Sequence, residues 1–385
     1  MKNHMQIPLS LYVHIPFCAQ KCPYCDFNSA KISFDEQVYV AALLDDLRRD
    51  VEIFALNGRK IQSIFFGGGT PSLFSVRAIC EILQGIGKII DIASDCEITL
   101  EANPNSSEVA KFSAYRQAGI NRISIGVQSF SNENLKVLGR IHSSNDAKNA
   151  ILAAEKAGFS CINTDLMFAL PNQNSDLALT DLKTAADFAI EHISWYQLTI
   201  EEGTAFFAAP PANLPDEDAI ADIFAAGREF LTAQGFEQYE ISAWTRNKKC
   251  RHNHNYWQFG DYLGIGAGAH GKISQAQEIV RTEKFASVKK YLARSGKNPN
   301  PYAAAVKKVE KDAQVFEFML NALRLKDGVP RQFLTERTDL ALEDIDGLIQ
   351  DLIARGLLAN DNDFYRTTEF GFNQLNIILE EFIPS

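Results

Sequence analysis

The feature that most constrains this chain is a group of three cysteines near its start. Cys18, Cys22 and Cys25 lie in the stretch Tyr-Val-His-Ile-Pro-Phe-Cys-Ala-Gln-Lys-Cys-Pro-Tyr-Cys, with three and then two residues between them. A protein-bound cluster of four irons and four sulfurs (4Fe–4S) usually takes four cysteine ligands. Three thiolates leave one iron without a protein ligand, so the spacing predicts a cluster whose fourth iron binds a small molecule.

Two other uses of cysteine fit the sequence less well. A structural zinc site normally needs a second Cys or His pair at matching spacing, and none follows within the next fifty residues. A disulfide framework needs an oxidising compartment, whereas the seven cysteines are odd in number and the first residues lack the apolar stretch of an export signal. We therefore expect a cytoplasmic protein, and we assign no role to Cys80, Cys96 and Cys161.

Length and charge exclude some classes of protein. A chain of 385 residues that is 46% hydrophobic can bury a large core in two or more domains. No apolar run approaches the ~20 residues that a membrane helix needs. The net charge of −10 disfavours a nucleic-acid partner, because phosphate binding draws on clustered Lys and Arg. We expect neither an integral membrane segment nor a nucleic-acid partner.

Along the first two hundred residues, short β-rich runs alternate with longer amphipathic segments. Strands are expected at 9–15, 61–66, 97–102, 122–127, 161–167 and 194–200, and helices at 36–56, 76–90, 107–118, 145–157, 177–190 and 216–234. This alternation is typical of parallel strands joined by helical crossovers. It predicts an α/β fold with a partial (β/α)6 barrel, and the Rossmann alternative is weaker because no G-x-G-x-x-G follows the first strand.

Polar residues gather where the predicted strands end. The cysteines follow the first strand, Gly67-Gly68-Gly69-Thr70 the second, Glu101 the third and Gln128 the fourth, and Asp165 lies in the fifth. In a β/α barrel the ligand site lies at the C-terminal ends of the strands, so these residues should meet at one rim. Each taken singly is better explained as a tight turn or a structural hydrogen bond, but their convergence favours a binding site.

Two of these motifs suggest specific contacts. Glycines let backbone N–H groups approach a ligand without obstruction by side chains. Glu101 ends an apolar strand, where an unpaired carboxylate would be costly to bury, so it should face a cavity. Arg140 could place a cation over a carboxylate. Tyr12 and His14 alternate with apolar residues and should share the interior face of the first strand.

Five motifs together resemble one branch of the radical S-adenosylmethionine (SAM) superfamily. They are Cys18 to Ser29, Gly67 to Ser72, Glu101 to Pro104, Gly126 to Phe130 and Leu138 to His142. This branch contains oxygen-independent coproporphyrinogen III oxidase and the HemW-type heme chaperones. The resemblance implies a radical-SAM barrel with the 4Fe–4S cluster on the three cysteines and SAM on the fourth iron. It implies SAM contacts from Tyr12, Tyr24, Gly68, Gly69, Thr70, Glu101, Gln128, Arg140 and Asp165.

Two departures separate the oxidase from the chaperones. The oxidase has a further cysteine two residues after the third cluster ligand, where this chain has Phe27. It also carries an extension before its cluster motif, whereas Cys18 lies almost at the start of this sequence. Both departures favour a heme chaperone, for which we assign no catalytic residue, and a coproporphyrinogen oxidase-like enzyme remains the alternative.

A further motif resembles the H-N-x-x-Y-W segment that is associated with heme in the chaperone branch. It runs from His252 to Trp257. Imidazole is an ordinary axial ligand of heme iron, and tyrosinate or thiolate can replace it. The resemblance makes His252 the leading axial ligand and Tyr256 the second, with Cys250 and His254 less favoured. Without it, a loop with buried hydrogen bonds would be the simpler explanation.

We divide the chain into three parts. Residues 1–240 are the predicted barrel, residues 241–305 a connecting segment with the heme motif, and residues 306–385 a mainly helical, winged-helix-like domain. In this last part we expect a helix that ends before Gly328, a helix over 342–354, a short hairpin over 361–367 and a helix over 370–382. The expected function is transfer of heme to an acceptor protein.

Overall fold

One sheet of twelve strands runs through most of the chain. The computed structural model describes residues 7–275 and 278–384. Six strands lie side by side and parallel, in the order of the sequence. They are β1 (Leu9–Ile15), β2 (Lys60–Gly68), β3 (Asp91–Ala102), β4 (Arg122–Gln128), β5 (Cys161–Phe168) and β6 (His192–Gln197). This confirms the predicted α/β architecture, with β6 beginning two residues earlier than expected because His192 already pairs with Asn163 of β5.

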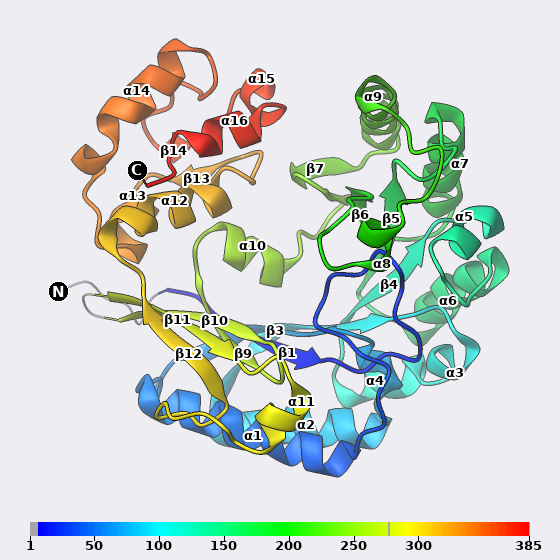
Figure 1. The fold of residues 1–385 in the computed structure, drawn as a ribbon, viewed down its shortest axis with the longest axis horizontal. Helices are drawn as coiled ribbons and strands as arrows, with labels where there is room; N and C mark the ends of the chain where they lie inside the picture. Colours follow the sequence, from blue (N-terminus) through cyan, green and yellow to red (C-terminus); the bar gives the residue numbers. More distant parts are fainter. Residues whose placement is uncertain (1–6, 276–277, 385) are drawn as a thin grey trace.

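Helices cover the outer face of these strands (Figure 1). They are α1 (Glu36–Ile53), α2 (Val76–Ile89), α3 (Ser106–Val109), α4 (Phe112–Ala118), α5 (Asn132–Val137), α6 (Ser144–Ala157), α7 (Ser175–Ala186) and α9 (Glu217–Ala233), with a 3-10 turn, η2 (Pro71–Leu73). The short helix α8 (Ala205–Ala208) lies instead beside the cysteine loop, where Phe206 N donates to Pro23 O at 3.0 Å. Local signals set the ends of α6, where Ser143 and Asp146 form a capping box and Gly158 closes the helix in a left-handed conformation. The helix predicted over 107–118 is divided into α3 and α4.

The strands place apolar side chains outward and polar ones inward. On β1, Leu11 and Val13 are fully buried in the core shared with α1 and α2. The alternate residues Ser10, Tyr12 and His14 face the other side of the strand. The inner surface of the partial barrel is therefore polar, which is unusual for a buried sheet face and requires hydrogen-bond partners throughout.

The segment predicted as a connection, residues 241–305, is instead part of the sheet. It contributes β8 (Ala243–Thr245), α10 (Arg251–Trp257), β9 (Asp261–Ile265), β10 (His270–Gln275), β11 (Glu278–Lys284), α11 (Val288–Leu292) and the start of β12 (Ala303–Lys308), after β7 (Glu237–Glu240). Strand β9 pairs in parallel with β1, from Leu9 opposite Asp261. The glycine-rich run 260–271 forms β9 and the turn to β10. Glycine is required at position 264, because a Cβ atom there would lie 1.9 Å from the carbonyl oxygen of His270.

A buried ion network joins this extension to α1. The Lys284 ammonium at the end of β11 lies 2.6 Å from Asp46 Oδ1 and 2.7 Å from Asp50 Oδ2, and all three side chains are almost inaccessible to solvent. Asn300 donates to both carboxylates, at 2.7 and 2.6 Å. Asp46 and Asp50 lie one helical turn apart, so one face of α1 holds the far side of the sheet in place.

The C-terminal part has the order of helices and strands that is typical of a winged helix. Its elements are α12 (Lys311–Ala322), β13 (Val329–Pro330), α13 (Gln332–Arg337), the 3-10 turn η3 (Leu342–Asp344), α14 (Asp346–Ala354), β14 (Phe364–Tyr365), α15 (Glu369–Phe372) and α16 (Leu375–Glu380). The hairpin expected over 361–367 is closed by a bridge between Leu358 and Thr367, and β14 also pairs with β13. The helix expected over 370–382 is interrupted between α15 and α16.

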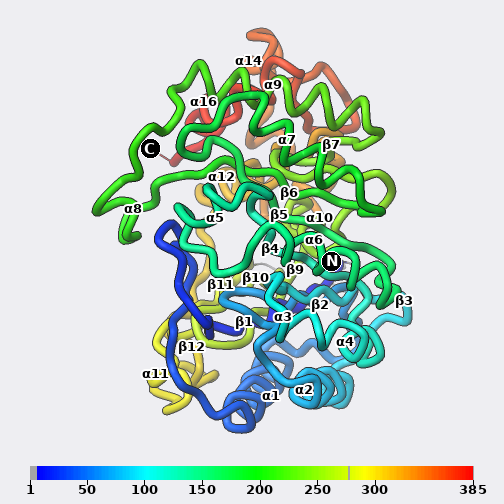
Figure 2. The backbone as a smooth tube through the Cα atoms, turned by 90° about the vertical axis from the view of Figure 1, so that its right-hand side faces the viewer, coloured from blue at the N-terminus to red at the C-terminus, as the bar shows by residue number. Residues whose placement is uncertain are grey.

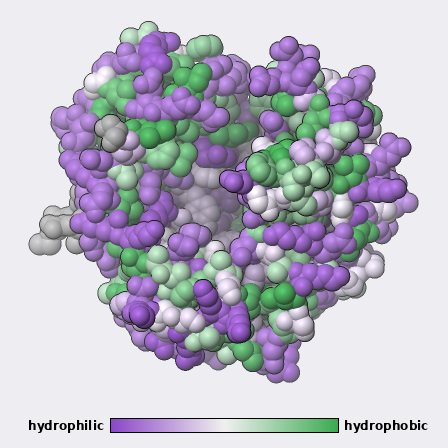
Figure 3. Space-filling model, in the orientation of Figure 1, coloured by the Kyte–Doolittle hydropathy of each residue, from purple (hydrophilic) through white to green (hydrophobic). Residues whose placement is uncertain are grey.

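This C-terminal part contacts both ends of the open sheet. Leu325 forms an antiparallel bridge with Glu240 at β7, and Glu317 pairs with Arg281 of β11 at 2.6 Å. Figure 2 shows α14 and α16 at one end of the molecule with α7 and α9, and α1 and α2 at the other end. The face seen in Figure 3 is hollowed near its centre, in the region where Figure 1 places α10. Within the described residues, no helix is long and apolar enough to cross a membrane.

Candidate functional site

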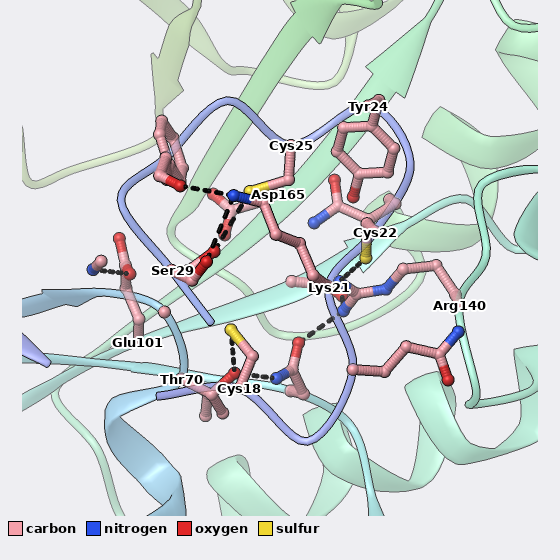
Figure 4. A pocket seen from close by; sticks show the side chains of 18 of the residues that line it. Cys18, Lys21, Cys22, Tyr24, Cys25, Ser29, Thr70, Glu101, Arg140 and Asp165 are labelled. Atoms are coloured by element: carbon pink, nitrogen blue, oxygen red, sulfur yellow. Dashed lines mark hydrogen bonds between the residues drawn. The ribbon is translucent and has the colours of Figure 1, made fainter. Parts of the chain in front are cut away.

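A cavity of about 350 Å³ opens where β1 to β5 end. It brings together most of the predicted site residues, which are Cys18, Cys22, Cys25, Tyr24, Gly68, Gly69, Thr70, Glu101, Gln128, Arg140 and Asp165. Figure 4 shows the cysteines, Arg140 and the two carboxyl groups arranged around this space. Residues that the sequence analysis did not select also line it, namely Gln20, Lys21, Phe27, Ser29, Ala102, Asn103, Ser124, Gly126 and Tyr196.

The cysteine loop is held by its own backbone and by one lysine. Cys18 N donates to Ala30 O at 3.0 Å, and Ala30 N donates to Pro16 O at 2.8 Å, which closes the loop at its base. Lys21 Nζ lies within the loop and donates to the carbonyl oxygens of Phe27 and Ser29. These contacts fix the shape of the loop.

Each cysteine sulfur has a polar neighbour in the cavity. Thr70 Oγ1 lies 3.6 Å from Cys18 Sγ, and Arg140 Nη1 lies 3.6 Å from Cys22 Sγ. Ser29 Oγ lies 3.8 Å from Cys25 Sγ. Hydrogen bonds to sulfur are one of the means by which a protein tunes an iron–sulfur cluster.

The three thiols line one cavity. Among the residues that the structure describes, no three His, Cys, Asp or Glu side chains are arranged to hold one metal ion. Burial raises the pKa of the Cys18 and Cys25 thiols, so a metal must displace their protons.

Tyr12 does not line the cavity but supports the cysteine loop from below. Its hydroxyl lies 3.0 Å from His14 Nδ1, and His14 Nε2 lies 2.8 Å from Asn28 O. A carbonyl oxygen only accepts, so His14 Nε2 carries the proton and Nδ1 accepts from Tyr12. The Asn28 side chain donates in turn to the carbonyl oxygens of Ala267 and Ala286, which ties the loop to the sheet extension.

The triple glycine allows β2 to approach the end of β1. The N–H groups of Gly68, Gly69 and Thr70 donate to Glu101 Oε2, Ile15 O and Phe17 O at 3.1, 2.8 and 2.8 Å. All three N–H groups therefore have partners within the protein, and a contact of this segment with a ligand stays a prediction. A Cβ atom at Gly69 would lie 2.7 Å from Phe17 O, so the requirement for glycine is steric.

Two carboxyl groups lie at the base of the cavity. Burial, and then the neighbouring Asp165, raise the pKa of Glu101 to about 8. Burial also raises the pKa of Asp165, although hydrogen bonds from Ser124 Oγ at 3.0 Å and Asn163 Nδ2 at 2.7 Å favour its charged form. Such a pair favours a ligand that brings positive charge or hydroxyl donors.

The other side of the cavity carries a fixed cation and a strained glutamine. Arg140 Nη2 donates to Gly126 O at 2.8 Å and to Asn103 Oδ1 at 2.5 Å, which fixes the guanidinium beside Cys22. Gln128 has a left-handed backbone, with φ of 69°, and accepts from Tyr196 OH at 2.6 Å. Strain of this kind at a residue other than glycine concentrates at functional sites.

The heme motif lies on α10, outside this cavity. His252 is 1% exposed, its Nδ1 lies 3.0 Å from Ser63 Oγ, and its Nε2 lies 2.7 Å from Tyr256 OH. Burial lowers the pKa of His252 to about 3, so the ring is neutral. Both ring nitrogens have partners, so neither is free to bind iron in this conformation. His254 lines a separate cavity near the start of β1 and β2, and Cys250 is buried.

Some of the lining residues that the sequence analysis missed could have been found from the alternation of side chains along each strand, once the C-terminal ends of the strands are known. Ser124 and Gly126 lie two residues apart on β4, and Asn103 directly follows β3. Their positions relative to Glu101 and Gln128 were readable in the sequence. Tyr196 was not, because its place at the cavity depends on the pairing of β6 with β5.

Comparison with known families gives two matches. A family model described as the radical SAM superfamily matches residues 12–183, and one described as the HemN C-terminal domain matches residues 309–372. The first match contains the cysteines, Glu101, Gln128, Arg140 and Asp165.

Individual relatives cover nearly the whole chain. Proteins named heme chaperone HemW from Haemophilus influenzae and from Escherichia coli K12 are each 46% identical to it over 98% of both chains. A mouse protein named radical S-adenosyl methionine domain-containing protein 1, mitochondrial, is 34% identical over 97% of this chain and 87% of its own. The solved structure of coproporphyrinogen III oxidase (HemN) from E. coli, described as a radical SAM enzyme, has a TM-score of 0.82 at 22% identity, over 98% of this chain and 90% of that one. This last likeness concerns the fold alone.

Proposed function

The chain belongs to the HemW family of the radical SAM superfamily, and from this premise we propose that it binds a 4Fe–4S cluster, SAM and heme, and passes heme to an acceptor protein in the cytoplasm. The observation that carries the proposal is the convergence of three cysteines, Arg140 and two carboxyl groups on one cavity at the ends of parallel strands.

Cys18, Cys22 and Cys25 would hold the cluster. When bound, the cluster supplies an iron with an open position for the amino and carboxylate groups of SAM, as the family resemblance implies. The protein would orient the cluster through the polar neighbours of the sulfurs, Thr70, Arg140 and Ser29.

The remaining cavity residues would hold SAM. The cavity is lined by Tyr24, Gly68, Gly69, Thr70, Glu101, Gln128 and Asp165. The carboxyl groups suit the amino group and the hydroxyl groups of the cofactor, and the Arg140 cation suits a carboxylate. Tyr12 would act through His14 on the cysteine loop and not by direct contact.

Heme would bind at α10, in the region where Figure 3 shows the hollow. A cavity of about 350 Å³ is at the lower end of the range for a single drug-sized ligand, so heme needs a separate place. His252 is the proposed axial ligand and Tyr256 the second candidate. His252 Nε2 must first leave the Tyr256 hydroxyl, so heme binding requires a local rearrangement of α10.

Anaerobic reconstitution followed by heme titration tests the proposal. We expect the brown cluster-loaded protein to bind about one heme and to shift its Soret band. His252→Ala should weaken heme binding while the cluster spectrum stays unchanged, and His254→Ala, on the same helix but in the other cavity, is the matched control. A reconstituted cluster without any Soret shift would contradict the heme assignment, and a colourless protein would contradict the cluster.

One observation bears on the oxidase alternative. Phe27 occupies the position of the oxidase's additional cysteine, lines the cavity and is 61% exposed. An apolar exposed side chain at this place favours a chaperone over an enzyme that needs a thiol there. Release of carbon dioxide from coproporphyrinogen III in an anaerobic assay would reverse this ranking.

A further inference from the structure

A chain of hydrogen bonds crosses the interior of the barrel from Asp165 to the start of α10. Asn163 Nδ2 donates to Asp165 Oδ1 at 2.7 Å, and Asn163 Oδ1 lies 2.6 Å from His192 Nδ1. His192 Nε2 lies 2.9 Å from Tyr239 OH, which accepts from Cys250 N at 3.2 Å. The four residues between Asp165 and α10 are at most 3% exposed, so water does not replace these contacts.

The chemistry of the partners gives the chain one direction. A carboxylate only accepts, so Asn163 turns its nitrogen to Asp165 and its oxygen to His192. His192 must then donate from Nδ1, and because burial keeps its pKa well below the usual value it is neutral and accepts at Nε2. Tyr239 therefore donates to His192 and accepts from Cys250. Every donor points towards Asp165.

The far end of the chain anchors the helix that carries the heme motif. Cys250 is the N-terminal capping residue of α10, and His252 N donates to Glu97 Oε1 at 3.1 Å. The Tyr239 hydroxyl is thus one of several barrel groups that hold the first turn of α10, together with Glu97, Ser63 and Asp95. If heme is to bind His252, this turn must move, because both ring nitrogens are engaged.

We propose that this chain couples the two ligand sites, so that SAM bound at Asp165 loosens the anchor of α10 and tightens heme binding. The inference rests on the proposed function. A ligand hydroxyl that donates to Asp165 competes with Asn163 Nδ2 for that carboxylate. Hydrogen bonds in a chain polarise one another, so the loss at Asp165 also weakens the contact of Asn163 with His192 and that of His192 with Tyr239. Thermodynamic linkage then requires heme to tighten SAM binding by the same factor.

Heme titrations with and without saturating SAM test the coupling. The full-length, cluster-loaded protein is used without reductant, so that SAM remains intact. For the wild type we expect SAM to lower the heme Kd by about fivefold or more, within the usual range of coupled sites. Tyr239→Phe removes one oxygen from the middle of the chain, and should bind heme without SAM as tightly as the wild type does with it.

A matched control separates coupling from damage to the core. Tyr115 is also fully buried with its hydroxyl bonded to two carbonyl oxygens, Ser72 O and Phe74 O, so Tyr115→Phe should keep the wild-type response to SAM. His192→Phe breaks the chain one step nearer Asp165 and should also abolish the response to SAM. It is the second test of the chain if Tyr239→Phe folds poorly. Circular dichroism and iron content check folding in each variant.

The outcomes distinguish the two proposals. A wild type that binds both ligands with a heme Kd indifferent to SAM overturns the coupling and leaves the proposed function intact. So does a folded Tyr239→Phe or His192→Phe variant that keeps the wild-type response. A wild type that binds no SAM or no heme removes the proposed function, and the coupling with it.

Discussion

Single residues at the site differ in whether their polar atoms are already engaged. The backbone N–H groups of the glycine motif and both nitrogens of His252 have partners within the protein. Glu101 is different. Its Oε2 accepts a hydrogen bond from the backbone N–H of Gly68, and its carboxyl group lies beside that of Asp165. Glu101 is therefore the acid more open to a ligand, since both oxygens of Asp165 accept hydrogen bonds from Ser124 and Asn163.

Binding of SAM should depend on pH through Glu101. Its pKa of about 8 means that the group is mostly protonated at pH 7 in the free protein. A cationic ligand favours the carboxylate, so binding at pH 7 should release a proton and the affinity should rise as pH increases from 7 to 9. Calorimetry in two buffers of different ionisation enthalpy measures the release. Glu101→Gln should remove this dependence, whereas Glu133→Gln, at the exposed start of α5 and outside the cavity, should keep it.

Gly69 should tolerate no side chain. In Gly69→Ala the new methyl group would meet Phe17 O at 2.7 Å, and relief of this contact moves the base of the cysteine loop. We expect a loss of about 1–3 kcal/mol of stability, as for other overpacked sites, and a lower iron content after reconstitution. Gly87→Ala in α2 is the control, since the nearest atom lies 3.7 Å away and alanine favours a helix. Equal iron content in the two variants would refute the steric role of Gly69.

At the scale of secondary-structure elements, the site lies where the parallel strands end. The ends of β1 to β5 were predictable because polar residues follow apolar runs at regular intervals, and these ends define the cavity. The strands β9 to β12 were not, since a short strand in a glycine-rich segment looks like a loop until its partner is known. The role of His192 was also hidden, because its partners Asn163 and Tyr239 come from distant strands.

The element contact most sensitive to substitution should be that between α1 and β11. Lys284→Met leaves Asp46 and Asp50 buried without a cation, and we expect a loss of about 3–5 kcal/mol in the free energy of unfolding. Lys289→Met on the exposed face of α11 should change stability by less than about 0.5 kcal/mol. Chemical denaturation of both variants compares them. Similar midpoints would show that the network contributes little.

At the level of the whole molecule, the C-terminal part is not an appendage. Its core includes Phe318 and Met319 together with Tyr239, Phe259 and Ile279 from the rest of the chain. The sequence predicted a separate unit over 306–385, which describes its helical composition well. It did not predict that the unit shares a core with α10 and the sheet extension, because that contact joins surfaces distant in sequence.

Removal of the C-terminal part should therefore prevent stable folding. A chain that ends at Lys308 would expose Tyr239, Phe259 and Ile279, and we expect it to aggregate or to bind hydrophobic dyes. A chain that ends at Phe382 keeps the residues of this core and should behave as the wild type. Size-exclusion chromatography with light scattering compares the two. A monomeric, cluster-binding product from the shorter chain would contradict the shared core.

The pairing of β1 with β9 has a consequence for biosynthesis. β1 lies in the middle of the sheet, but one of its two neighbours is translated roughly 250 residues later. At the usual 5–20 residues per second, the growing polypeptide carries an unpaired strand edge beside the cysteine loop for roughly 10–50 s. During this interval Asn28 also lacks its acceptors at Ala267 and Ala286. Iron–sulfur insertion into a correctly shaped loop therefore belongs after the ribosome has passed residue 286, and a holdase that shields the edge until then would raise the yield of loaded protein.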